Sequence, residues 1–152
     1  MSLQASGTDT DEQLERIFYA LPYGIDEGLW AKPLGKGQYE VRSIPLITPN
    51  LNFKDVVQIR AGSVDGRYYI GEVVRRSGHK AYGIDLEDTD ESLRHEILEK
   101  LVSMHVRFER PFELEELFAI DVAPECDYIG ICNYLKVLEQ QKILRLIGMD
   151  SK

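Results

Sequence analysis

The chain has 152 residues, which suits one domain or two small subdomains that share a core. Hydrophobic residues make up 43% and charged residues 29%, and this ordinary globular composition argues against a disordered chain. The formal net charge is −8 with only 18 Lys and Arg residues, which argues against nucleic acid as the main partner, because binding to a phosphate backbone depends on clustered cations.

Both ends of the chain are polar and short. Residues 1–15 have neither a basic start nor an apolar stretch, so they predict a disordered leader and not a secretory signal. Residues 149–152 are expected to form a tail. No apolar run approaches the ~20 residues that a membrane span needs, so we expect no membrane contact and a cytoplasmic location.

The two cysteines, Cys126 and Cys132, predict free thiols. If the segment is helical, their Cα atoms lie roughly 9 Å apart at 1.5 Å per residue, which is beyond the reach of a disulfide. Reduced thiols of this kind are typical of a reducing compartment.

Residues 16–76 predict a β-rich subdomain of short strands. Apolar and polar residues alternate along most segments, and Pro, Gly and Asp-Gly signals separate them. Gly71 interrupts the alternation of the last segment, which indicates a bulge. We therefore expect a small antiparallel sheet or a partial barrel. The expected strands span residues 16–21, 29–33, 38–44, 55–61 and 67–76, with tight turns at Gly35-Lys36-Gly37 and Val64-Asp65-Gly66-Arg67.

Residues 77–148 predict a second subdomain in which strands and helices alternate. Leu93, Ile97 and Leu101 recur at helical spacing, and either Asp88 or Asp90 is placed to cap that helix. The order β-α-β-β-α-β is typical of the ferredoxin-like arrangement, in which two helices cover one face of a four-stranded antiparallel sheet. The chain is therefore predicted to be an α+β protein. The expected elements are strands 79–86, 106–111, 117–122 and 143–147 and helices 90–105 and 127–141.

The segment that joins the two halves is the main candidate site. Ser77-Gly78-His79 follows directly after Arg75-Arg76. A serine and a histidine together suggest a nucleophile and its base, but residues two apart on an extended chain are not placed for proton transfer. No strand-turn-helix elbow surrounds the serine either. Three interpretations stay open: a turn with a half-buried, hydrogen-bonded histidine, which the sequence favours, a contact with a ligand or partner, and catalysis.

The sequence shows no motif for a metal or a cofactor. Asp85 begins an acidic run, but the sixth position of a calcium loop, which needs Gly, holds Asp90. His95 and His105 are ten residues apart, so they cannot bind one metal from the same helix face. The glycines around Lys36 lack the following helix of a phosphate-binding loop. We therefore predict no metal, no cofactor and no catalytic residue.

Aromatic side chains in the predicted strands allow three interpretations. They could pack in the core, form a protein interface, or stack on bases as in ribonucleoprotein domains. Residues 117–122 do not resemble the basic, aromatic motif of those domains, which disfavours base stacking. The aromatic residues concerned are Trp30, Tyr68, Tyr69 and Tyr82.

Several short segments, in order, carry a resemblance to a known family. They are Leu29-Trp30-Ala31, Gly37-x-Tyr39-x-Val41, Ile44-Pro45, Asp55-Val56-Val57, Ser77-Gly78-His79, Ala119-Ile120-Asp121-Val122, Asp127-Tyr128, and Leu135 with Glu139. Over roughly residues 16–147 the chain resembles the bacterial family catalogued as domain of unknown function 4265. The departures from the family pattern are Ser43, Leu46, Lys80-Ala81 and Lys142. The resemblance implies a bacterial, cytoplasmic protein and no known activity.

Two functional hypotheses follow from these patterns. The first is a non-enzymatic protein that binds another protein, because the chain is acidic, lacks a catalytic motif and has β-rich halves with edges to expose. A basic partner would suit the negative charge of the chain. Small acidic families of this kind often serve as toxin-neutralising immunity proteins, and by analogy we consider that role for this chain. The alternative is a small-ligand sensor or an enzyme with a site at the junction. The binding residues expected for it are Trp30, Tyr82, Arg75, Arg76, Ser77, Gly78 and His79.

Overall fold

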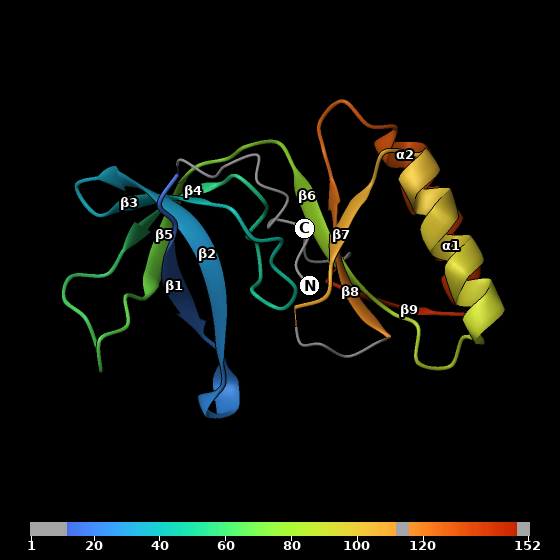
Figure 1. Ribbon diagram of the computed structural model, residues 1–152, viewed down its shortest axis with the longest axis horizontal. Helices are drawn as coiled ribbons and strands as arrows, with labels where there is room; N and C mark the ends of the chain where they lie inside the picture. The colour runs from blue at the N-terminus through green and yellow to red at the C-terminus, as the bar shows by residue number, and fades with distance from the viewer. Residues whose placement is uncertain (1–11, 112–115, 149–152) are drawn as a thin grey trace.

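The structure is a computed structural model that describes residues 12–111 and 116–148. It is an α+β fold with two antiparallel sheets and two helices, and the second sheet lies between the helices and the first sheet (Figure 1). The predicted fold class is confirmed. Most of the predicted leader and the whole predicted tail lie outside the described residues.

The first sheet is a meander in which each strand pairs with the next one along the chain. An isolated bridge joins Phe18 to Tyr69, and the Phe18 N–H donates to the Tyr68 carbonyl at 2.9 Å. The first strand therefore approaches the last, and the sheet is a partly closed barrel. Its elements are β1 (Glu15–Ala20), the 3-10 turn η2 (Pro22–Gly24), β2 (Asp26–Gly35), β3 (Gln38–Val41), β4 (Val56–Ile59) and β5 (Ile70–Arg75).

The predicted turns and the predicted bulge of the first sheet are confirmed. Lys36 lies between β2 and β3 with a φ of 57° and is flanked by two glycines that also have positive φ. Asp65 has a φ of 54° in the second turn, which is a conformation that Asp tolerates better than most residues. Opposite β4, Glu72 pairs with Gln58 and Ile70 pairs with Ile59, so Gly71 is the extra residue of the bulge.

The second sheet has the strand order β7-β8-β6-β9, and every pair in it is antiparallel. This order is that of the ferredoxin-like fold, so the prediction from residue 79 onward is confirmed. Asp90 and Asp127 cap the two helices through hydrogen bonds from backbone N–H groups. The elements are β6 (Lys80–Asp85), α1 (Glu91–Ser103), β7 (Arg107–Glu109), β8 (Leu117–Val122), α2 (Tyr128–Gln140) and β9 (Arg145–Ile147).

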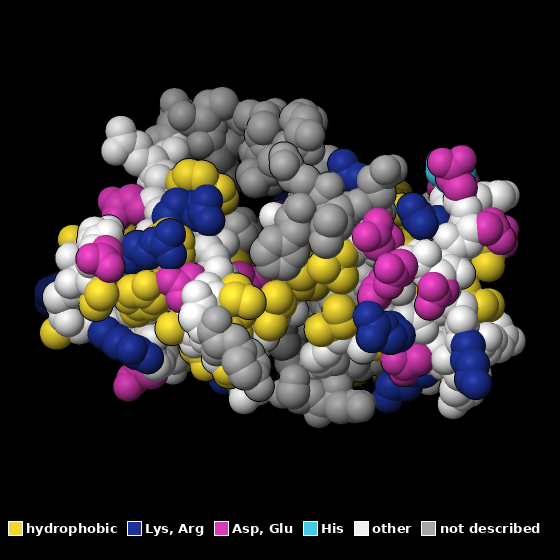
Figure 2. Space-filling model, turned by 90° about the horizontal axis from the view of Figure 1, so that it is seen from below, with side chains coloured by type: hydrophobic (Ala, Val, Ile, Leu, Met, Phe, Trp, Pro, Cys, Tyr) yellow, Lys and Arg dark blue, Asp and Glu magenta, His cyan; other side chains and the backbone are white. Residues whose placement is uncertain are grey.

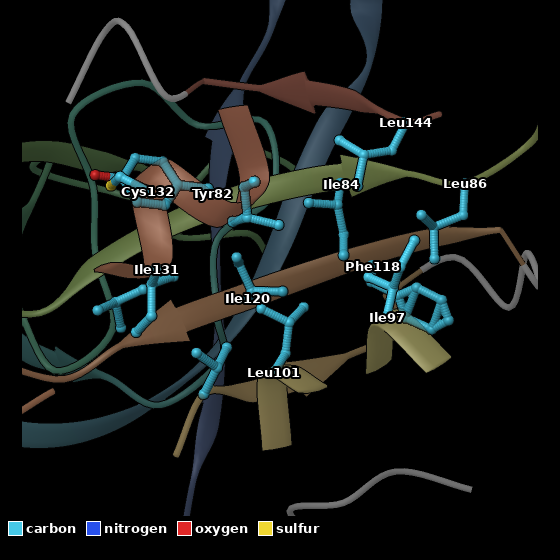
Figure 3. Close-up of a cluster of buried hydrophobic side chains, with 13 residues drawn as sticks. Tyr82, Ile84, Leu86, Ile97, Leu101, Phe118, Ile120, Ile131, Cys132 and Leu144 are labelled. Atoms are coloured by element: carbon cyan, nitrogen blue, oxygen red, sulfur yellow. The ribbon is translucent and has the colours of Figure 1, made fainter. Parts of the chain in front are cut away.

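The helices cover one face of the second sheet and form the larger core with it. Alternate residues of β6 and β8 point toward the helices, and the buried ones are Tyr82, Ile84, Phe118, Ile120 and Val122 (Figure 3). The labelled side chains of this cluster are Tyr82, Ile84, Leu86, Ile97, Leu101, Phe118, Ile120, Ile131, Cys132 and Leu144. Cys126 and Cys132 are free thiols, as predicted. Neither described helix is long and apolar enough to cross a membrane.

The opposite face of the second sheet packs against a long loop from the first half, residues 42–55, here called the bridging loop. Leu46 and Phe53 of this loop form a buried cluster with Ala81 of β6 and Ala119 of β8. At Gly83 a Cβ atom would lie 2.6 Å from Leu46 Cδ1, so only glycine allows the loop to approach this closely. Small residues on this face of the sheet thus make room for the loop.

Two buried carboxylates hold the bridging loop in place. Glu27, only 4% exposed, accepts hydrogen bonds from the backbone N–H groups of Leu46 (2.8 Å) and Thr48 (2.7 Å). Asp55, fully buried, accepts hydrogen bonds from the N–H groups of Asn52 (3.0 Å) and Ser77 (2.8 Å). Hydrogen bonds to charged groups are stronger than neutral ones, so these acids fix a loop whose backbone pairs with β2 and β3 only near its two ends.

The variant Glu27→Gln is expected to lower the free energy of unfolding by about 2–4 kcal/mol, because its amide is a weaker acceptor than a carboxylate and its NH₂ meets backbone donors. Denaturant unfolding measures the change. Glu72→Gln on the exposed side of β5 is the matched control, with an expected change within about 0.5 kcal/mol. Equal stability of the two variants would contradict the role given to Glu27.

Candidate functional site

The connection between the two sheets is held by Ser77. Its N–H donates to Asp55, and its hydroxyl donates to the Phe53 carbonyl at 2.6 Å. The His79 N–H donates back to the Ser77 Oγ at 3.1 Å. The intervening Gly78 has a φ of 91°, which favours glycine, and a Cβ there would lie 3.2 Å from Pro124. Ser77 therefore fixes the connection to the bridging loop, and its hydroxyl proton is already engaged.

His79 is oriented by Asp121 of β8. The His79 Nδ1 lies 2.9 Å and 3.0 Å from the two carboxylate oxygens, and the Asp121 side chain is fully buried while that of His79 is 13% exposed. Burial raises the pKa of Asp121, and the hydrogen bond with His79 acts against that rise. With Asp121 ionised, Nδ1 donates, so Nε2 is the ring atom available for other contacts. No group in residues 12–111 and 116–148 hydrogen bonds to Nε2.

Three side chains at the junction lie around the ring of Phe53. The His79 ring meets it edge-on, with centroids 5.4 Å apart. The Arg107 guanidinium carbon lies 4.7 Å from the ring centroid, and Lys54 Nζ lies 5.9 Å from it. Arg107 is also the cross-strand neighbour of Asp121. A buried aromatic ring thus organises a histidine and two cations on the side of the second sheet that faces the bridging loop.

The structure brings together only part of the predicted set of binding residues. Arg76 lies with Ser77, Gly78 and His79 at the junction, and its guanidinium is 3.2 Å from Asp55. The other three predicted residues lie elsewhere: Arg75 is exposed on β5, Trp30 is on the outer face of β2, and Tyr82 is buried under α2, where its hydroxyl bonds that of Tyr128.

The junction does not place Ser77 and His79 as a nucleophile and its base. The Ser77 hydroxyl points to a backbone carbonyl and the His79 Nδ1 points to Asp121, so their side chains do not bond each other. In the part of the chain that the structure describes, no group of three His, Cys, Asp or Glu side chains could hold a metal ion. The side chains at the junction can therefore contribute hydrogen bonds and charge to the binding of a ligand.

A second candidate lies on the outer face of the first sheet, and we call it the Arg16 face: Arg16, Phe18, Trp30 and Arg67. The Arg16 guanidinium carbon lies 5.0 Å from the Trp30 ring and 5.6 Å from the Phe18 ring. The Arg67 guanidinium carbon lies 4.4 Å from the Phe18 ring. At Gly28 a Cβ would lie 2.0 Å from Arg16 Nη2, so the missing side chain makes room for the arginine. Cations and aromatic rings alternate across this face.

The two arginines of the Arg16 face differ in their charge partners. Arg67 pairs with Asp26 at 2.8 Å, and Asp26 also accepts a hydrogen bond from Tyr69, which together with Arg67 lowers the pKa of Asp26. Arg16 is exposed and makes no ion pair with a carboxylate of the described residues. On the side of the molecule shown in Figure 2, Lys and Arg lie against hydrophobic side chains over the first half, and acidic and basic side chains are interspersed over the helical end.

The variant Glu109→Gln is expected to be more stable than the wild type at pH 7. Burial raises the pKa of Glu109 in β7, which means that the folded state binds a proton more readily than the unfolded state. The stability that this carboxyl contributes is therefore present below its unfolded pKa and is lost as the pH rises through the folded pKa. Glutamine keeps an acceptor for the Ile44 N–H and carries no charge.

Denaturant unfolding at pH 7 and near pH 4 measures this effect. We expect the advantage of Glu109→Gln to shrink toward pH 4, where the wild-type carboxyl is protonated. A stability advantage that stays constant with pH, or a loss of stability at pH 7, would contradict this prediction. Either result would show that the buried charge of Glu109 does not destabilise the folded protein.

Comparisons with known proteins agree with this fold. A crystal structure of a hypothetical protein from Neisseria gonorrhoeae is similar, with a TM-score of 0.72 at 18% sequence identity, over 90% of this chain and 93% of that chain. No curated protein matches. The family model for the domain of unknown function DUF4265 matches residues 27–146, which include the bridging loop and the junction. The chain therefore belongs to the DUF4265 family.

Proposed function

We propose that the protein recognises another protein through the Arg16 face and acts as a binding protein. The single observation that supports this most is the position of Arg16, an exposed guanidinium held between the rings of Trp30 and Phe18 without a described carboxylate partner. Trp, Tyr and Arg are the residue types that dominate the binding energy of protein interfaces. The contact with the rings also orients the arginine before binding, which reduces the entropy that binding costs.

The partner's contact is a carboxylate that lies beside an apolar side chain. A guanidinium stacked on rings keeps its N–H groups in the plane free for a two-pronged hydrogen bond with a carboxylate. Trp30, 37% exposed, supplies apolar surface next to it. The net charge of −8 favours a partner that is basic overall, as the sequence predicts, so the acidic group is a local feature of its interface.

Toxin neutralisation is one biological role that fits a small acidic binding protein. In such a pair the partner is a basic or neutral toxin, and the gene for it lies beside the gene for this chain. Recovery of such a neighbour as the captured protein would support this role, and a captured protein without toxicity would oppose it while leaving protein recognition intact.

The test is affinity capture from the native host, followed by a binding measurement with the purified partner. We expect Arg16→Ala and Trp30→Ala each to weaken binding by at least about 30-fold, because truncation of such residues at the centre of an interface costs about 2 kcal/mol or more. Gly28→Ala is the sharper variant, since its Cβ displaces the Arg16 guanidinium without removing any cation or ring.

Arg60→Ala is the matched control, an exposed arginine just after β4 whose loss leaves affinity unchanged. Full affinity in Arg16→Ala and Trp30→Ala would contradict the proposal, as would recovery of a nucleic acid in place of a protein. Circular dichroism of each variant shows that the fold is kept.

A further inference from the structure

We propose that β7, an outer strand of the second sheet, pairs with the same strand of a second copy of this chain, in an antiparallel arrangement centred on Phe108. The four-stranded sheets of the two copies then continue as one sheet across a two-fold axis. This contact is a sheet-edge interface of residues 106–110, and it does not include the Arg16 face.

The two edges of the second sheet differ in what covers them. β7 and β9 are its outer strands. On β9 the Leu146 N–H donates to the Glu139 carboxylate at 2.9 Å, so a side chain of the same molecule already covers that edge. In the part of the chain that the structure describes, the backbone of Arg107, Phe108 and Glu109 pairs with β8 alone. Alternate residues of an edge strand direct their N–H and C=O groups away from the sheet, so β7 presents unpaired backbone groups.

The geometry of β7 is also regular enough for strand pairing. Its register with β8 runs without a bulge, from Arg107 opposite Asp121 to Glu109 opposite Ala119. In the first sheet, β5 has two register shifts against β4, and such shifts twist an edge away from pairing. β1 already bonds the segment just before β5 through the Phe18 N–H. Of the sheet edges in the described residues, β7 is therefore the most accessible to a new strand.

The charges of β7 are complementary to themselves in one register. Antiparallel pairing about Phe108 places Arg107 of each copy opposite Glu109 of the other, which gives two pairs of opposite charge. A two-fold axis at Arg107 or at Glu109 places like charges opposite each other, and a shift of one residue places Arg107 opposite Arg110. The charges of this strand therefore favour a second copy as the occupant and select the register.

The two faces of β7 both contribute to the contact. On the helix side, the half-buried Phe108 packs edge-on against Phe118 with ring centroids 5.7 Å apart, and the two Phe108 rings of the pair lie opposite each other. On the other side, burial raises the pKa of Glu109 in the single chain, although Arg107 of the same chain acts against that rise. The Arg107 of the second copy adds another cation and stabilises the ionised form further.

The pair is weak, because a strand this short buries little surface. It forms at high protein concentration and dissociates on dilution. At the dilution of an unfolding experiment the chain is a monomer, so the stability expected for Glu109→Gln is that of the monomer.

The test is sedimentation of the full chain over a range of concentrations up to about 1 mM, where we expect a reversible equilibrium between monomer and dimer. NMR spectra over the same range locate the contact. We expect the amide resonances of residues 106–110 to shift with concentration and those of β9 to stay constant. A chain that is monomeric at every concentration would overturn the proposal and leave this edge to a strand of another protein. A dimer whose shifts lie elsewhere would overturn it as well.

Exchange of the charges tests the register. Arg107→Glu places acids opposite each other and Glu109→Lys places cations opposite each other, so each variant alone is expected to weaken dimerisation by about 10-fold. An equimolar mixture of the two variants restores the dimer, because every opposite pair then joins an acid to a cation. Lys136→Glu on the exposed side of α2 changes the net charge as Arg107→Glu does, and this control keeps the dimerisation of the wild type.

Circular dichroism shows whether each variant keeps the fold, since Glu109 accepts a hydrogen bond from the bridging loop. If Glu109→Lys does not fold, Arg107→Glu decides alone, because Arg107 is exposed. Equal dimerisation of Arg107→Glu and Lys136→Glu would overturn the proposal, as would a mixture of folded variants that forms no more dimer than either alone. Arg16→Ala keeps the dimer, so this result is independent of protein recognition through the Arg16 face.

Discussion

The arrangement of the two sheets depends on two buried carboxylates that bind the backbone of the bridging loop. Glu27 extends from β2 and holds the middle of the loop, while Asp55 at its end holds both the loop itself and the connection at Ser77. The side chain of Asn52 accepts from the Ala81 N–H at 2.7 Å, which joins the same loop to β6. Without these contacts the loop would leave buried polar groups unpaired, which costs more than the hydrogen bonds themselves contribute.

Side chains alternate between the two faces of the central strands. The helices therefore cover one face of the second sheet, and the bridging loop covers the other. Along β6 and β8 one set of residues packs under the helices, and the other set, including Ala81 and its cross-strand partner Asp121, lies on the face toward the bridging loop. His79 sits just before β6, so its ring reaches Asp121 and Phe53 from the edge of the packed region. The Arg16 face lies on the other side of the first sheet, because Arg16 and Trp30 alternate with the core residues of β1 and β2.

Local patterns were enough to predict the strands, the two helices and the ferredoxin-like order, because periodicity, caps and turn residues act over a few positions. They were not enough for the site. Asp121 alternates with apolar residues along β8 and looks like an outward residue of a strand with one solvated face, but the bridging loop covers that face. Tyr82 and Trp30 were both expected near His79. Their positions depend on which face of each sheet is covered, and contacts between residues far apart in the sequence decide which face that is.

The most direct test of this account is whether the two sheets unfold together. Trp30 is the only tryptophan and reports on the first sheet by fluorescence, while circular dichroism reports on α1 and α2, which cover the second sheet. If the bridging loop joins the sheets into one cooperative unit, both signals follow the same transition in urea with the same midpoint. Two separated transitions would contradict the account, because they would show that either sheet stands without the contacts made by Glu27 and Asp55.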